Sequence, residues 1–188
     1  KAGKISLKNP KDRALVRQYW RTSILPRDSD EFFLQQYKSY ISTDDILKKI
    51  EFLTWHRSFS NAERLIAKLP KKYKALPTMR IRVFKRPHRH NSYLRKAPAS
   101  IINDELIQFA IAQYYTKKGN EKQAYLKLVS IKPKSNFDKW WKLKSIAIRN
   151  SLENKSYQRA YNLTKNHNLS YGVDHYICYA KKIPHYCI

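Results

Sequence analysis

Two histidines separated by one residue form the most metal-like pattern in the chain. His88 and His90 flank Arg89, and a His-x-His pair can ligate zinc when further ligands come from elsewhere in the fold. The sequence neighbours Arg86, Arg89 and Arg95 would oppose a divalent ion, and no cysteine or carboxylate lies nearby in sequence. We therefore predict no metal site and no cofactor.

A thiol and two imidazoles near the end of the sequence could suggest a nucleophile pair. Cys178 lies close in sequence to His175 and His185, but closeness in sequence does not provide the hydrogen-bond geometry that activates a thiol. Cys178 and Cys187 could also form one disulfide, and two cysteines leave the redox compartment open. We predict no catalytic residue in this segment.

Glycosidase chemistry would need a carboxylic acid held as a proton donor, usually in a pocket that raises its pKa. Nine of the fourteen acidic residues stand at positions that a structural role explains. Five stand at expected helix starts: Asp44, Asp45, Asp104, Glu105 and Asp138. Four fall on helices or turns among basic residues: Glu51, Glu63, Glu121 and Glu153. No pair has a recognisable active-site context, so we predict no catalytic carboxylate.

The net charge of +25 should attract nucleic acid, anionic lipid surfaces or an acidic polymer. An AT-rich genome would also produce the abundance of Lys, Asn, Ile and Tyr. The charge is densest over residues 71–96, where Tyr73, Phe84 and Tyr93 stand between ten basic residues. Such a mixture can bind single-stranded nucleic acid, whereas the alternative is a solvated loop between repeats. No RNP aromatic pair or GXXG clamp accompanies it.

The elements expected to position these residues are helices. Only three glycines are present, and apolar residues recur at spacings of three and four. A pair of helices joined by a short turn is predicted three times, around residues 46–69, 106–128 and 140–163. Capping residues support these starts, with Ser42 or Thr43 before the first pair and Asn136 or Asp138 before the third.

Repetition of a paired-helix unit predicts an all-α fold, specifically an α-superhelix or solenoid of tetratricopeptide-like hairpins. The predicted domain covers residues 1–174, with a basic irregular insert at about 71–100 and an atypical tail at 175–188. Four aromatic residues of the third pair could line a sugar-binding face, but their helical spacing favours the core between repeats; these are Trp140, Trp141, Tyr157 and Tyr161. No apolar span is long enough to cross a bilayer.

Several short stretches resemble the superhelical region of the soluble lytic murein transglycosylases. The most specific stretch comprises Trp140, Trp141, Arg149, Leu152, Ala160, Tyr161 and His167. Earlier stretches that fit are Trp20 and Arg21 with Glu31, Phe32 and Leu34; Thr43, Asp44 and Asp45 before Leu53; and Asn61, Ala62, Glu63 and Arg64 before Leu65. The resemblance covers most of residues 11–173.

This resemblance implies a periplasmic protein of cell-wall remodelling, whose partner is peptidoglycan. In the family, the superhelix supports a lysozyme-like domain that cleaves between N-acetylmuramic acid and N-acetylglucosamine and leaves a 1,6-anhydro end. The family's catalytic Glu is followed by Ser, and none of the six glutamates here precedes a Ser. The family's Gly-Leu-Met-Gln motif is absent too. We therefore expect a chain that is inactive alone.

The sequence departs from the family after Asp174, where an acidic, Trp-containing helix would follow. Residues 175–188 are instead aromatic, basic and Cys-containing. We expect that the lysozyme-like domain is missing or encoded separately and that the signal peptide lies outside the residues shown. Two other functions stay open: a basic helical-repeat module that binds nucleic acid, and a tetratricopeptide-like protein scaffold.

Overall fold

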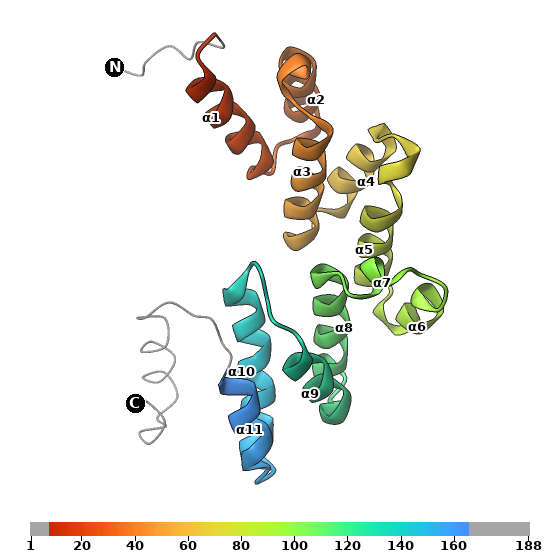
Figure 1. The fold of residues 1–188 in the computed structure, drawn as a ribbon, viewed down its shortest axis with the longest axis vertical. Coiled ribbons are helices and arrows are strands. Elements are labelled where there is room, and N and C mark those ends of the chain that lie inside the picture. Colours follow the sequence, from red (N-terminus) through yellow and green to blue (C-terminus); the bar gives the residue numbers. More distant parts are fainter. Residues whose placement is uncertain (1–7, 166–188) are drawn as a thin grey trace. The chain divides into compact units, whose positions relative to one another are not determined.

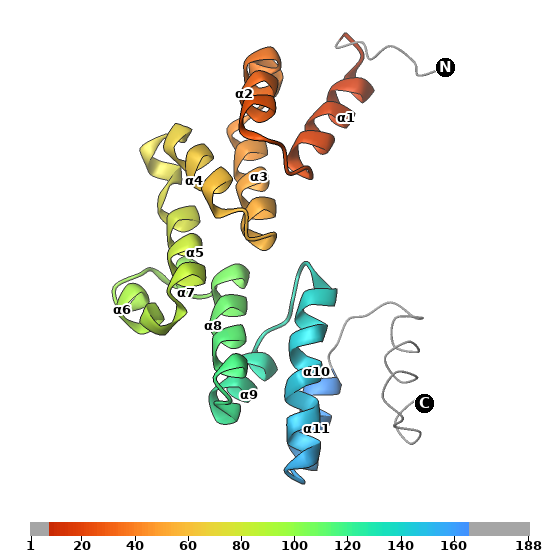
Figure 2. The ribbon, with the colours of Figure 1, turned by 180° about the vertical axis from the view of Figure 1, so that it is seen from behind.

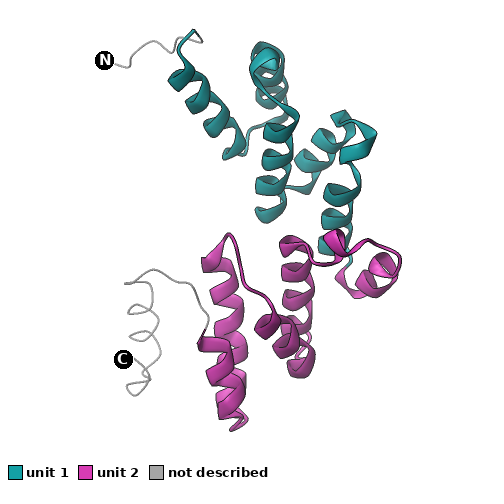
Figure 3. Ribbon diagram, viewed as in Figure 1, with its two compact units in different colours: residues 1–86 teal, residues 87–188 magenta. Residues whose placement is uncertain are grey.

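The computed structural model describes residues 8–165, and all regular structure in this range is helical (Figure 1). Eleven α-helices and three short 3-10 helices follow one another, with no strand between residues 8 and 165. The predicted all-α class is confirmed. The chain divides into two compact units, residues 1–86 (unit 1) and 87–188 (unit 2) (Figure 3).

Unit 1 contains five α-helices within its described part. They are α1 (Pro10–Arg21), α2 (Arg27–Gln36), α3 (Thr43–Trp55), α4 (Phe59–Lys68) and α5 (Ala75–Lys85), with 3-10 turns η1 (Lys38–Tyr40) and η2 (Lys71–Tyr73). Helix α3 packs against α1, α4 and α5. Its start is the predicted one, because Ser42 and Asp45 form a reciprocal capping box that satisfies backbone donors of the first turn.

A buried polar network lies in the centre of unit 1. The indole Nε1 of Trp20 donates to Asp30 Oδ1 (2.8 Å), and the Arg64 guanidinium donates to Asp30 Oδ2 (2.9 Å). Lys49 donates from Nζ to the backbone carbonyls of Trp20 and Ser23, so it holds the end of α1 against α3. Trp20, Asp30 and Lys49 are all buried. The network therefore joins α1, α2, α3 and α4.

Unit 2 contains six α-helices within its described part. They are α6 (His90–Leu94), α7 (Ala99–Ile102), α8 (Glu105–Lys117), α9 (Glu121–Ser130), α10 (Phe137–Glu153) and α11 (Tyr157–Thr164), after the 3-10 turn η3 (Pro87–Arg89). Helix α8 buries seven consecutive residues, from Leu106 to Ala112. A helix that is buried on most sides has neighbours on most sides, and α8 contacts η3, α7, α9 and α10.

The predicted irregular insert at about residues 71–100 is wrong, because helices α5 and α6 and the start of α7 lie there. Pro77, Ile81 and Phe84 are buried on α5 at spacings of four and three, which is one face of a helix. Pro77 falls in the first turn, where its missing N–H leaves no helical hydrogen bond unmade. The high density of basic residues obscured this apolar stripe in the sequence.

The three predicted helix pairs are confirmed as α3–α4, α8–α9 and α10–α11. Each pair is joined by three residues, and the middle one has a positive φ: Arg57 (58°), Gly119 (68°) and Lys155 (55°). In each turn the third residue donates its N–H to a carbonyl five residues earlier, as Ser58 does to Leu53 (2.9 Å). The middle residue donates to a carbonyl three residues earlier, as Arg57 does to Thr54 (3.1 Å).

These paired bonds define a Schellman motif. The other two motifs use Asn120 to Tyr115 with Gly119 to Thr116, and Ser156 to Ser151 with Lys155 to Leu152. Five residues after each positive-φ position stands a buried alanine, Ala62, Ala124 or Ala160. The three hairpins therefore have the same type of turn and a buried alanine at the same position in the second helix, although they lie in two units.

Within unit 2 the second and third hairpins stack on each other. Helix α10 packs against α8 and α9, and α11 packs against α9 (Figures 1 and 2). The rings of Phe109 on α8 and Trp140 on α10 meet edge to face, with centroids 5.0 Å apart. Stacking of this kind buries the apolar face of one hairpin on its neighbour.

We expect Lys155→Gly to raise the free energy of unfolding by about 0.5–1 kcal/mol, because glycine adopts positive φ without the penalty of a Cβ. Gly119→Ala should lower it by about 1 kcal/mol through backbone strain alone, since no atom lies within 4 Å of the added carbon. Urea denaturation measures both changes. Lys142→Gly, in the interior of α10, is the control and should destabilise by about 1 kcal/mol. A loss of stability in Lys155→Gly equal to that in Lys142→Gly would contradict the turn assignment.

Burial lowers the pKa of Lys49 to about 8, although the negative charge of Asp30 partly offsets this. The unfolded chain binds one proton more than the folded chain between the lowered pKa and the ordinary Lys value, so this residue makes stability rise from about pH 8 to about pH 10.5. An NMR titration of the Lys49 Nζ resonance should give a midpoint near 8, with exposed Lys68 as the reference. A midpoint of Lys49 equal to that of Lys68 would contradict the buried placement.

Candidate functional site

A pocket of about 550 Å³ lies in unit 2 among helices α6, α7, α8 and α9. Pockets of this volume suit small-molecule ligands. Its lining includes two cationic residues and no carboxylate. The polar side chains that the site could use are Asn91, Arg95, Gln108, Tyr115, Gln123 and Lys127.

Helical spacing explains why these side chains share one pocket. Gln108, Ile111 and Tyr115 recur at three and four residues along α8, so they lie on one face of that helix. Gln123 and Lys127 are four residues apart on α9. The turn through Gly119 and Asn120 brings both faces together, and the Asn120 side chain caps α9 by accepting from the Gln123 N–H (3.2 Å).

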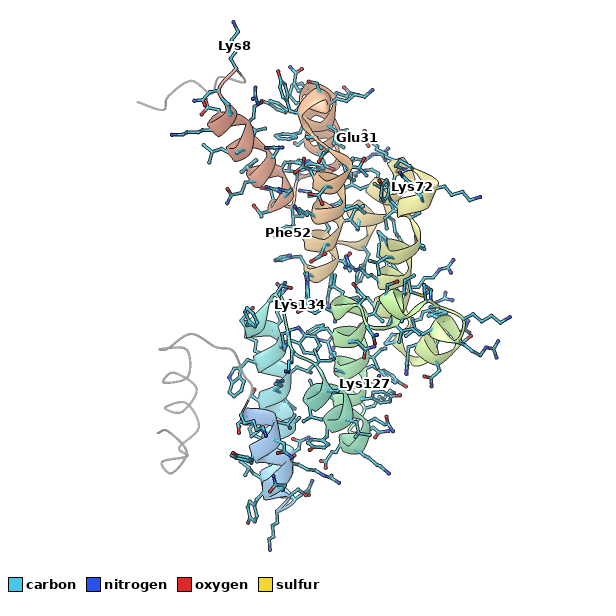
Figure 4. The ribbon with its side chains drawn as sticks, in the orientation of Figure 1. Lys8, Glu31, Phe52, Lys72, Lys127 and Lys134 are labelled. Atoms are coloured by element: carbon cyan, nitrogen blue, oxygen red, sulfur yellow. The ribbon has the colours of Figure 1, made fainter. Side chains whose placement is uncertain are left out.

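Gln108 fixes the position of the Lys127 ammonium group. The Gln108 side chain is buried, its Nε2 donates to the carbonyl of Ile102 (2.5 Å), and its Oε1 accepts from Lys127 Nζ (3.3 Å). The same carboxamide therefore joins α7, α8 and α9. Lys127 projects from α9 in Figure 4.

The His-x-His pair does not act as a unit in the structure. His88 is exposed, whereas His90 is buried in α6. His90 Nδ1 donates to the carbonyl oxygen of Pro87 (2.7 Å), and its Nε2 lies 3.2 Å from the Tyr115 hydroxyl oxygen. His90 thus attaches α6 to α8. Among residues 8–165, no three His, Cys, Asp or Glu side chains group as metal ligands.

The basic and aromatic segment at residues 71–96 is partly engaged within the fold. Lys74 donates to the carbonyl of Ala67 (2.8 Å), Arg80 pairs with Glu51 (3.1 Å) and Lys85 pairs with Glu63 (2.7 Å). Phe84 is buried beside Phe59, with ring centroids 5.9 Å apart. Tyr73 remains 37% exposed, and the ammonium of Lys72 lies 4.8 Å from its ring centroid. Figure 4 labels Lys72.

Seven of the nine carboxylates discussed above take part in caps, hydrogen bonds or ion pairs; they are Asp44, Asp45, Glu51, Glu63, Asp104, Glu105 and Glu121. Burial acts to raise the pKa of Asp45, but hydrogen bonds from Ser42 and the charges of Arg21 and Arg17 outweigh it, so the pKa is lowered. Asp45 is therefore ionised, which is the wrong state for a proton donor. Asp104 caps α8, and Glu121 accepts from the Asn154 side chain (3.0 Å).

Glu105 has a structural role that matches that of Asp30 in unit 1. Its Oε1 accepts from Trp140 Nε1 (2.9 Å) and from the backbone N–H of Ser135 (3.2 Å), and its Oε2 accepts from the Ser135 hydroxyl (3.3 Å). Glu105 therefore holds α10 and the preceding linker against α8. Trp140 is buried, as predicted, but Tyr157 and Tyr161 are each 61% exposed, so their predicted core position is wrong.

Several residues named in the sequence analysis lie outside the described residues. They are Cys178 with His175 or His185, Cys187, and His167, which belongs to the resemblance. None of the helices within residues 8–165 has the length and apolar character needed to cross a membrane.

The sequence prediction missed the pocket, although the spacing of Gln123 and Lys127 after the Gly119 turn was a usable signal. Comparison with protein-family models, curated proteins and solved structures finds no match.

We expect Glu105→Ala to lower the free energy of unfolding by about 1.5–3 kcal/mol, because it leaves the buried Trp140 N–H without its acceptor. Chemical denaturation followed by tryptophan fluorescence measures the change. Glu153→Ala, at an exposed position on α10, is the matched control and should stay within about 0.5 kcal/mol of the parent chain. Equal effects of the two substitutions would contradict this role of Glu105.

Proposed function

We propose that this chain is a non-catalytic superhelical region similar to that of the soluble lytic murein transglycosylases, and that it binds peptidoglycan in the periplasm. The observation that carries the proposal is the position of the residues on which the resemblance rests. In unit 1 several of those residues form ion pairs between helices: Arg21 pairs with Asp45 (3.4 Å), and Arg64 lies 3.7 Å from Glu31 while it also pairs with Asp30. They are residues that build helix packing.

Several other residues of the resemblance also contribute to packing of the hairpins. Leu53, Ala62 and Leu65 are buried between α3 and neighbouring helices of unit 1, and Trp140 and Ala160 are buried in unit 2. These packing positions within the motif set support a resemblance in architecture. It does not by itself imply an active site, which agrees with a non-catalytic role.

The packing of the hairpins supports a superhelix. Three hairpins share the same Schellman turn, and the second and third stack through α8, α9, α10 and α11. Regular turns and repeated stacking are the properties from which solenoids are built. The charge of +25 suits a polymer that carries anionic peptide stems.

One observation favours nucleic acid as the second candidate. Lys72 and Tyr73 form a partly exposed cation–π pair on η2, and exposed Lys71 precedes them. An exposed ring beside cations is suited to base stacking and phosphate contacts. In this proposal the occupied side chains Arg80, Lys85 and Phe84 contribute to the fold and not to such a surface.

We expect the chain to sediment with purified peptidoglycan sacculi at about 0.15 M salt, where a Debye length near 8 Å screens diffuse attraction. Binding of single-stranded RNA, measured in parallel across a salt series, should be weaker. Retention on RNA with a steep log-linear salt slope, together with no retention on sacculi, would overturn the proposal in favour of nucleic acid. The matched variants are Lys72→Gln with Tyr73→Leu, which should lower RNA binding alone.

Incubation of the chain with sacculi should release no 1,6-anhydro muropeptide, because the carboxylates described above are engaged in caps and ion pairs. Chromatography of the soluble products measures this. An active lytic transglycosylase is the positive control. Release of the anhydro product would show that one of these carboxylates is catalytic.

A further inference from the structure

The pocket of unit 2 has the electrostatic character of an anion site. Its two charged lining residues, Arg95 and Lys127, are both cationic, and its lining contains no Asp or Glu. Within residues 8–165 neither side chain takes part in an ion pair. Two cations that line one pocket without a carboxylate make that pocket favourable to an anion.

Lys127 is prepared to bind such an anion. Its Nζ bonds the buried Gln108 carboxamide (3.3 Å), which is itself anchored to the carbonyl of Ile102. An ammonium has three donors, so two remain for a ligand. Because Gln108 already fixes the ammonium in position, binding costs less side-chain entropy than it would at a mobile lysine.

The rest of the lining describes the body of the ligand. Leu94, Ile102 and Ile111 provide apolar surface, while Asn91 and Gln123 carry carboxamides that can both donate and accept. A bare inorganic anion would leave this surface unused. An acylated peptide matches it, since its amides and small side chains accompany one terminal carboxylate.

We propose that this pocket binds a short acylated peptide through its C-terminal carboxylate, with Lys127 and Arg95 as the carboxylate ligands. The ligand chemistry has two sources: an ordinary protein C-terminus built of L-residues, and a peptidoglycan stem peptide that ends in D-residues. All residues that line the pocket belong to unit 2, so peptide binding there does not depend on the proposed function. The link to peptidoglycan rests on that function.

The test is calorimetric titration of the full chain with acetyl-alanyl-alanine, as L,L and D,D forms, each beside its C-terminal amide. The acid should bind and the amide should bind at least about 10-fold more weakly, because the amide lacks the charge that Lys127 and Arg95 recognise. Lys127→Gln and Arg95→Gln should each weaken binding of the acid about 10- to 100-fold. Preference for either enantiomer supports the site, and preference for D,D assigns it to stem peptides.

The matched controls remove the same charge outside the pocket. Lys122→Gln on α9 and Arg149→Gln on α10 are exposed and outside the lining, so both should bind the acid as the parent does. Equal binding of acid and amide, equal losses in Lys122→Gln and Lys127→Gln, or no binding of the acid at about 10 mM would each overturn the inference. Melting temperatures equal to the parent's confirm that the variants are folded.

Failure of this inference and failure of the proposed function give different results. If sacculi retain the chain and the dipeptides do not bind, the pocket inference is wrong and peptidoglycan binding stands. If the dipeptide acid binds and sacculi do not retain the chain, the pocket inference stands and the proposed function is wrong.

Discussion

Each unit depends on a buried tryptophan whose indole N–H must find an acceptor. A buried donor without a partner costs about 1–3 kcal/mol, and each unit meets this demand with a carboxylate from another helix. Asp30 accepts from Trp20 in unit 1, and Glu105 accepts from Trp140 in unit 2. Each carboxylate then uses its remaining capacity on other elements, the Arg64 guanidinium in one case and the linker at Ser135 in the other. These directional hydrogen bonds add to the apolar packing between the helices and help to fix their register.

The few acidic residues of the chain serve mainly as hydrogen-bond acceptors within the fold. The chain carries 14 acidic residues against 39 basic ones, so those at internal positions act as acceptors for caps, indoles and guanidinium groups. This use keeps Asp45 ionised, with a lowered pKa, and occupies Glu105 with four donors. A carboxylate with such partners contributes to stability, whereas a catalytic acid needs surroundings that favour its protonated form.

The helices were predictable where local signals agreed, and the pocket was not. Ser42 and Asp104 mark helix starts and Gly119 marks a turn, because capping and positive φ depend on a few neighbouring residues. Helix α5 was missed because the charged residues Arg80, Arg82 and Lys85 interrupt its apolar pattern in the sequence. The contact of Gln108 with Lys127 and that of His90 with Tyr115 join residues 19 and 25 positions apart, and such pairings follow from packing that sequence periodicity does not describe. The superhelix and the peptidoglycan partner remain predictions.

The three hairpins also share the same number of residues between the turn and the buried alanine of the second helix. Five residues separate the positive-φ position from the alanine at the helix crossing in every hairpin, at Ala62, Ala124 and Ala160. One residue advances a helix by about 100°, so an insertion or deletion in that interval would turn the alanine away from the partner helix and present a larger side chain there. These hairpins can therefore exchange residue types widely, including Arg57 and Lys155 where glycine fits best, while remaining intolerant of any change in length between turn and crossing.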